Sequence, residues 1–209
     1  MRIAVTAATH YSQVYRYGTK AAMIWLAAIR SPDGSFPQNS WINGTAYWSG
    51  FQLDEITVPI LLAWQLHTRG VTLGQFDPCI MVLRATAYLI LHGPVMVQER
   101  WEKNEGYSPS TLATVTASLV CVAEFVEDRD EPDTAEFILA YADWLAAHLE
   151  EWTVTTKGEL AEGYRRHFIR INPANPQAPD PHSGNAEPVR SFTRPDRDNA
   201  SREPASWCL

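Results

Sequence analysis

The sequence predicts an all-α body followed by an irregular, proline-rich tail. Apolar residues recur at helical spacing in successive segments, and several segments begin or end with capping residues, glycine or proline. No convincing alternating strand pattern occurs before residue 152. Hydrophobic residues make up 45% and charged residues 20% of the 209 residues, which is typical of a globular protein.

The first two helices are expected over residues 17–30 and 53–69. The first has one apolar face and is stopped by the Ser-Pro-Asp-Gly turn at 31–34. The second begins with two acidic residues, which favour the positive end of the helix dipole, and Gly70 lies just beyond its end. Pro59 falls inside this second pattern, so a kink is expected there.

The connection over residues 35–51 is long, and its aromatic content argues against disorder. Its large aromatic residues are Phe36, Trp41, Tyr47 and Trp48. Loops of this kind commonly carry function. Trp41 and Trp48 are either core side chains or platforms on which a sugar ring could stack, and the residues alone favour neither.

Three further helices are expected over residues 77–92, 108–128 and 131–150. Asp77 is a suitable N-cap with Pro78 at the first helical position, and Ser108 followed by Pro109 repeats that signal. Short strands are expected at 152–156 and 167–171. Helix pairs of this size recur in solenoids and closed toroids, so these five helices predict part of a larger architecture.

The composition changes after Asn172. Half of the chain's 14 prolines lie in residues 173–209, together with many Ser, Asn, Asp and Arg residues. Such a segment has few apolar side chains with which to build a packed core. The sequence therefore predicts one helical domain over residues 1–172 and an irregular or disordered tail over residues 173–209.

Several classes of function are disfavoured by composition and motifs. The net charge of −7, without a basic stripe, disfavours nucleic acid as a partner. The six histidines show no pairing at metal-ligand spacing, and no P-loop or dinucleotide fingerprint is present, so we expect neither metal nor cofactor. Three cysteines, no signal peptide and no run of about 18 apolar residues predict a reduced protein in the cytoplasm, not in a membrane.

The segment 98–111 carries the densest chemistry in the chain. It places Glu99, Trp101 and Glu102 within a few residues before a glycine turn and a helix start. A carboxyl group beside an indole can be desolvated, which raises its pKa and keeps the proton that a glycosidic leaving oxygen needs. The alternative is a helix connection with solvated charges. Asp54 either serves the helix dipole or hydrogen-bonds a sugar hydroxyl.

These residues resemble a known family. The run Gln98-Glu99-Arg100-Trp101-Glu102, followed by Gly106-Tyr107-Ser108-Pro109, is similar to the bacterial and archaeal glucoamylases of glycoside hydrolase family 15. Further stretches match in the family's order, at residues 33–39, 43–48, 52–55, 152–156 and 167–171. The resemblance covers roughly residues 17 to 181, and the 98–113 motif is the specific part of it.

The resemblance implies that residues 1–172 are part of an (α/α)6 barrel. It also implies exo-acting release of glucose from α-glucans or related α-glucosides, with inversion and without a cofactor. In the family's motif the general acid follows the Trp, which makes it Glu102 here. Trp101 and Trp48 would line the sugar subsites, Asp54 would support the pocket wall, and Glu99 would join the hydrogen-bond network near the acid.

The sequence departs from the family pattern at Lys103, where the family commonly has a second acidic residue. A cation stabilises a neighbouring carboxylate and lowers its pKa, which does not suit a proton donor. The family's catalytic base belongs to a downstream segment that residues 173–209 do not resemble. We therefore expect a truncated copy with reduced or no activity alone, whose exposed barrel faces associate with one another or with a complementary chain.

Two alternatives remain open from the sequence. The first is a non-catalytic carbohydrate-binding or interaction module derived from the same barrel, which the cation at Lys103 favours. The second is a different helical-barrel glycosidase in which Asp54 or Glu55 is the catalytic base.

Overall fold

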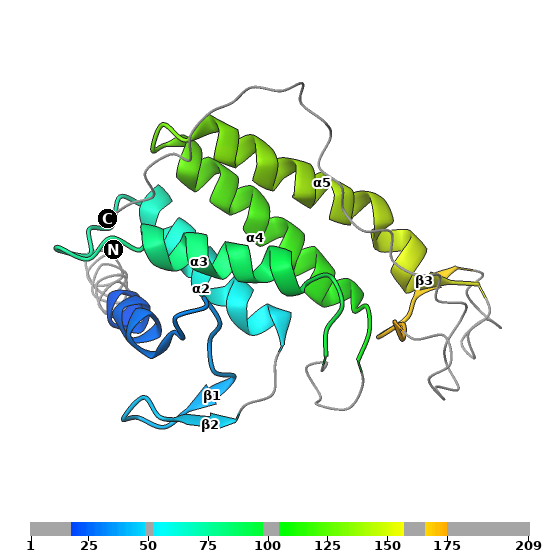
Figure 1. Ribbon diagram of the computed structural model, residues 1–209, viewed down its shortest axis with the longest axis horizontal. Helices are drawn as coiled ribbons and strands as arrows, with labels where there is room; N and C mark the ends of the chain where they lie inside the picture. Colours follow the sequence, from blue (N-terminus) through cyan, green and yellow to red (C-terminus); the bar gives the residue numbers. More distant parts are fainter. Residues whose placement is uncertain (1–17, 49–51, 98–104, 157–165, 175–209) are drawn as a thin grey trace, which may run out of the picture.

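The structure is a computed structural model that describes residues 18–48, 52–97, 105–156 and 166–174. It is mostly helical, as the sequence predicts (Figure 1). Its helices are the N-terminal helix Gly18–Ile29, α2 Leu53–Thr68, α3 Cys79–His92, α4 Pro109–Glu127 and α5 Pro132–Thr153. Its strands are β1 Asn39–Ser40, β2 Ala46–Trp48, β3 Val154–Thr155 and β4 His167–Phe168.

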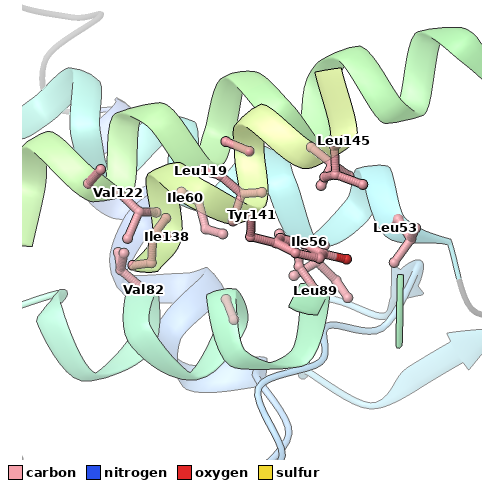
Figure 2. Packing of buried hydrophobic residues seen from close by; sticks show 14 of the residues in the cluster. Leu53, Ile56, Ile60, Val82, Leu89, Leu119, Val122, Ile138, Tyr141 and Leu145 are labelled. Atoms are coloured by element: carbon pink, nitrogen blue, oxygen red, sulfur yellow. The ribbon is translucent and has the colours of Figure 1, made fainter. Parts of the chain in front are cut away.

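Helix α4 is central to the packing. It lies along α5 on one side and α2 on the other, while α3 packs against both α2 and α4 (Figure 1). Figure 2 shows apolar side chains from these four helices meeting in one cluster. The cluster includes Ile56, Ile60, Val82, Leu89, Leu119, Val122, Ile138 and Leu145, all buried. Burial of this apolar surface is the main stabilising contribution to the fold.

The predicted capping residues accept hydrogen bonds from backbone N–H groups at two helix starts. The Ser108 hydroxyl accepts a hydrogen bond from the Thr111 N–H at 3.5 Å, and Pro109 opens α4. A carboxylate oxygen of Asp77 accepts from the Cys79 N–H at 3.0 Å. Helix α3 nevertheless begins at Cys79 with Pro78 as its N-cap, so the prediction of Asp77 as N-cap and Pro78 as the first helical residue is shifted by one position.

The prediction of a long loop over residues 35–51 was wrong in part, because residues 39–40 and 46–48 form short strands. Strands β1 and β2 pair there as an antiparallel hairpin. The Asn43 side chain accepts from the Thr45 N–H at 3.0 Å, and Gly44 adopts φ +86, which a side chain would strain. This Asn-Gly turn holds the hairpin closed although its strands are too short to show an alternating pattern.

The predicted strand at 152–156 was also wrong in part. Helix α5 continues to Thr153, and only Val154–Thr155 forms β3, which pairs antiparallel with His167–Phe168 in β4. Trp152 is buried on α5. Tertiary packing of this side chain extends the helix into residues whose local preference favours a strand.

The predicted domain boundary at residue 172 stays a prediction. Pro173 is buried and Ala174 packs against the core, so the packed body includes both residues. Residues 175–209 lie outside the described part of the chain.

Helix α4 is long and apolar enough to cross a membrane by length and composition alone, and half of its apolar window is buried inside the protein. Central helices of globular cores pass the same test, and α4 packs against α2 and α5 in this way. Of the three cysteines, Cys79 is a buried free thiol and Cys121 a half-buried one.

Candidate functional site

The start of α2, the end of α3 and one face of α5 meet beside Gly93. A methyl group added at Gly93 would lie 3.4 Å from the Tyr141 hydroxyl and 3.8 Å from Leu53 Cδ1. Gly93 opens the connection between α3 and α4, and Leu53 directly precedes Asp54. The packing therefore brings the first turn of α2 next to the connection that contains the 98–104 segment.

The two ends of that segment are tied together by backbone hydrogen bonds. The Met96 N–H donates to the Gly106 carbonyl, and the Gly106 N–H donates to the Met96 carbonyl, both at 2.9 Å. A pair of bonds of this kind is one rung of an antiparallel ladder. Met96 and Gly106, which flank residues 97–105, are thus held together close to the start of α4.

A second rung follows immediately. The Tyr107 N–H donates to the Asn172 carbonyl at 2.7 Å, and the Asn172 N–H donates to the Tyr107 carbonyl at 2.9 Å. Gly106 adopts φ +143, and a methyl group there would come within 2.2 Å of the Asn172 carbonyl oxygen. Only glycine fits this position without displacing the neighbouring backbone.

An aromatic cluster packs around Tyr107, one of the two residues of the second rung. Tyr107 stacks on Trp152 with ring centroids 5.1 Å apart, and Trp152 stacks on His148 at 5.0 Å. Trp144 meets the edge of Trp152 at 5.3 Å. Burial raises the pKa of the Tyr107 hydroxyl to about 12, so this side chain is a packing group and not a proton donor near neutral pH.

Glu55, in the first turn of α2, is the most perturbed carboxyl group in the described part of the chain. One of its oxygens accepts from the Gln52 N–H at 3.2 Å, and the other is buried without a hydrogen-bond partner. Burial raises its pKa to about 8, with a smaller contribution from the charge of Asp54. A carboxyl group with this pKa is mostly protonated at neutral pH, so only a minor fraction of Glu55 is ionised and able to accept a proton.

The structure describes only some of the predicted site residues. Asp54 is half-buried in the first turn of α2. Trp48 lies in β2, but its side chain is outside the description, as are residues Glu99, Trp101 and Glu102 as a whole. Within the described ranges, no group of three or more His, Cys, Asp or Glu residues could hold a metal ion.

Trp41 is one of two tryptophans for which the sequence left a core position and a sugar-stacking role open. Its side chain is 58% exposed, so it is not a core residue. It meets Tyr47 edge to face across the hairpin, with ring centroids 5.1 Å apart. An exposed pair of aromatic rings offers an apolar surface for a ligand.

The sequence did not indicate a role for Asn172. It also did not indicate that the Glu55 carboxyl group is largely buried. The Gln52-x-x-Glu55 spacing matches a capping box, which could have indicated the hydrogen bond at the start of α2. No local pattern marks Asn172, because its partners Tyr107 and Trp152 are distant in sequence.

The profile of "Glycosyl hydrolases family 15" matches residues 30–201. The match includes the whole α3–α4 connection and the described hairpin, and it runs beyond the predicted boundary at residue 172. It therefore spans every predicted site residue.

Two relatives support the same relationship. A glucoamylase of Clostridium sp. (strain G0005) is 35% identical over 147 residues, which are 70% of this chain and 20% of that protein. The crystal structure of a bacterial glucoamylase complexed with acarbose is 32% identical, with a TM-score of 0.64, over 81% of this chain and 22% of that one. The chain thus spans about a fifth of the length of these relatives, and its helices form part of an all-α barrel.

Proposed function

Because the chain belongs to family 15 of the glycosyl hydrolases, we propose that it carries the proton-donating half of a glucoamylase-like site for α-glucans or related α-glucosides. The observation that carries this proposal is the family match across the 98–104 segment, whose ends the Met96–Gly106 rung ties together. Glu102 is the proposed general acid. Trp101 and Trp48 are the proposed sugar platforms.

The proposed reaction is exo-acting and inverting. Glu102 protonates the leaving glycosidic oxygen while a carboxylate base activates water on the opposite face of the sugar, about 6.5–9.5 Å away. Asp54 supports the pocket wall, and Glu99 hydrogen-bonds near the acid. The base is not assigned to a residue of this chain, and Lys103 beside Glu102 favours a carboxylate over a protonated acid, so we propose low turnover by the chain alone.

The test is glucose release by the 209-residue chain from maltotetraose, isomaltotriose and trehalose. We expect slow release that falls at least about 100-fold in Glu102→Gln, since an amide cannot donate the catalytic proton. Glu105→Gln is the matched control, because it removes an exposed carboxylate from the same connection. Proton NMR of fresh product should show β-glucose. Release that persists in Glu102→Gln would contradict the assignment of the acid.

The second candidate is a non-catalytic carbohydrate-binding module. The exposed Trp41–Tyr47 pair favours it, because binding alone needs an aromatic surface and no acid–base pair. Affinity electrophoresis in gels containing soluble starch distinguishes the two functions. Retardation without any glucose release supports the binding module, and release that depends on Glu102 supports the enzyme.

A further inference from the structure

Asn172 connects three segments that are far apart in the sequence. Its backbone forms the rung with Tyr107, with hydrogen bonds of 2.7 and 2.9 Å. Its side-chain amide Nδ2 donates to the Trp152 carbonyl at 2.7 Å. Only 4% of the residue is exposed, so this side chain is committed to the interior.

Trp152 closes the set of contacts by stacking on Tyr107, with ring centroids 5.1 Å apart and an interplanar angle of 26°. Each of the three residues therefore contacts the other two. We call Tyr107, Trp152 and Asn172 the anchor. It holds the start of α4 against the end of α5.

The Asn172 amide also satisfies a helix end. Trp152 is the second-to-last residue of α5, and carbonyls in the last turn have no partner within the helix. The Asn172 Oδ1 atom is buried without a hydrogen-bond partner, so donation through Nδ2 is the side-chain hydrogen bond that the residue makes. A buried amide held by one such bond has a defined orientation. The same bond restrains the position of the Asn172 backbone, which pairs with Tyr107.

We propose that Asn172 is a positioning residue for the α3–α4 connection. The Tyr107 rung adjoins the Gly106 rung, and Gly106 is paired with Met96 at the other end of the 97–105 segment. A displacement at Asn172 is therefore passed to both ends of the segment that carries Glu102. The consequence for catalysis rests on the proposed function, whereas the anchoring does not.

The first test measures amide hydrogen exchange in the full chain. Asn172→Ala removes the amide, and Asn172→Asp keeps its size but removes the N–H donor. Asn43→Ala is the matched control, because it removes an Asn side chain that bonds a backbone N–H in the distant hairpin. We expect exchange at Met96, Gly106 and Tyr107 to accelerate at least about 10-fold in both position-172 variants and to stay unchanged in the control. Unchanged exchange at these three amides in the Asn172 variants would overturn the proposal.

The second test measures the kinetics of glucose release from maltotetraose. Misplacement of a catalytic group lowers the rate of the chemical step, so we expect kcat to fall about 10-fold or more while KM changes less than about twofold. An unchanged kcat with accelerated exchange would reduce Asn172 to a purely structural residue. A wild-type chain that neither releases glucose nor binds acarbose would contradict the proposed function, and the exchange rates alone would then decide the anchoring.

Discussion

Gly106 shows how one residue allows two backbone segments to approach closely. Its φ is +143, and a methyl group on its Cα would lie 2.2 Å from the Asn172 carbonyl oxygen, which leaves no room for a side chain. We expect Gly106→Ala to lower the free energy of unfolding by about 2 kcal/mol or more, because it combines backbone strain with a clash. Urea denaturation measures this loss.

Gly70 provides the control for Gly106. It also has a positive φ, of +61, but a methyl group there would meet nothing within 4 Å. Gly70→Ala should therefore cost only the conformational strain, about 1 kcal/mol. Equal losses in the two variants would show that the contact with Asn172 contributes nothing.

Glu55 makes stability depend on pH. Its pKa is about 8 in the folded protein and near 4.3 in an unfolded chain, so the folded state binds the proton more tightly. Its contribution to stability is therefore full below about pH 4 and is lost as the pH rises through about 8. Glu55→Gln removes the titration, while its amide oxygen can still accept from the Gln52 N–H.

We expect the Glu55→Gln variant to be less sensitive to pH between about 5 and 9 than the wild type, and more stable at about pH 9. Thermal melts across this range measure the difference. Glu105→Gln controls for the loss of one negative charge, because that side chain is exposed. Parallel curves for the wild type and Glu55→Gln would mean that Glu55 ionises freely in the folded state.

At the scale of elements, polar contacts link α2 to α4 near their C-terminal ends. The Trp64 indole N–H donates to a Glu124 carboxylate oxygen at 2.9 Å, and His67 pairs with Asp128 at 2.9 Å. A double-mutant cycle with Trp64→Phe and Glu124→Ala should give a coupling of about 0.5–1 kcal/mol, because the bond is partly exposed. Chemical denaturation of the four proteins measures it, and strictly additive effects would argue against the contact.

Helix starts were predictable because their signals are local. Ser108 followed by Pro109 and the acidic first turn of α2 identify where α4 and α2 begin, and both predictions are confirmed. The end of α5 was not predictable from Val154 and its neighbours. Their β-branched side chains favour a strand, and the burial of Trp152 that extends the helix depends on contacts with other elements.

The candidate site likewise has one part that the sequence predicts and one part that depends on tertiary packing. The charged residues around Trp101 form a compact motif that indicates a family from sequence alone. The anchor forms no such local motif, because Tyr107, Trp152 and Asn172 come together only when α4, α5 and the segment after β4 are packed. Local patterns thus indicate chemistry, while the supports of that chemistry depend on the tertiary fold.

At the scale of the whole molecule, the chain spans about a fifth of its relatives and forms part of a barrel. Apolar side chains are exposed on its helices, including Val58 on α2, 57% exposed, and Val120 on α4, 48% exposed. Exposed apolar surface of this kind favours association. We expect the chain to form concentration-dependent oligomers in sedimentation velocity and light-scattering experiments.

The double variant Val58→Ser and Val120→Ser tests whether the helix faces cause this association. It should shift the chain toward the monomer, because two apolar contacts on the helices are lost. Ile42→Ser is the matched control, since Ile42 is 96% exposed but lies in the hairpin turn and not on α2 or α4. If Ile42→Ser disperses the oligomers and the double variant does not, the hairpin is the contact surface. A wild-type chain that stays monomeric at high concentration would show that the exposed helix faces are too small or too polar to associate.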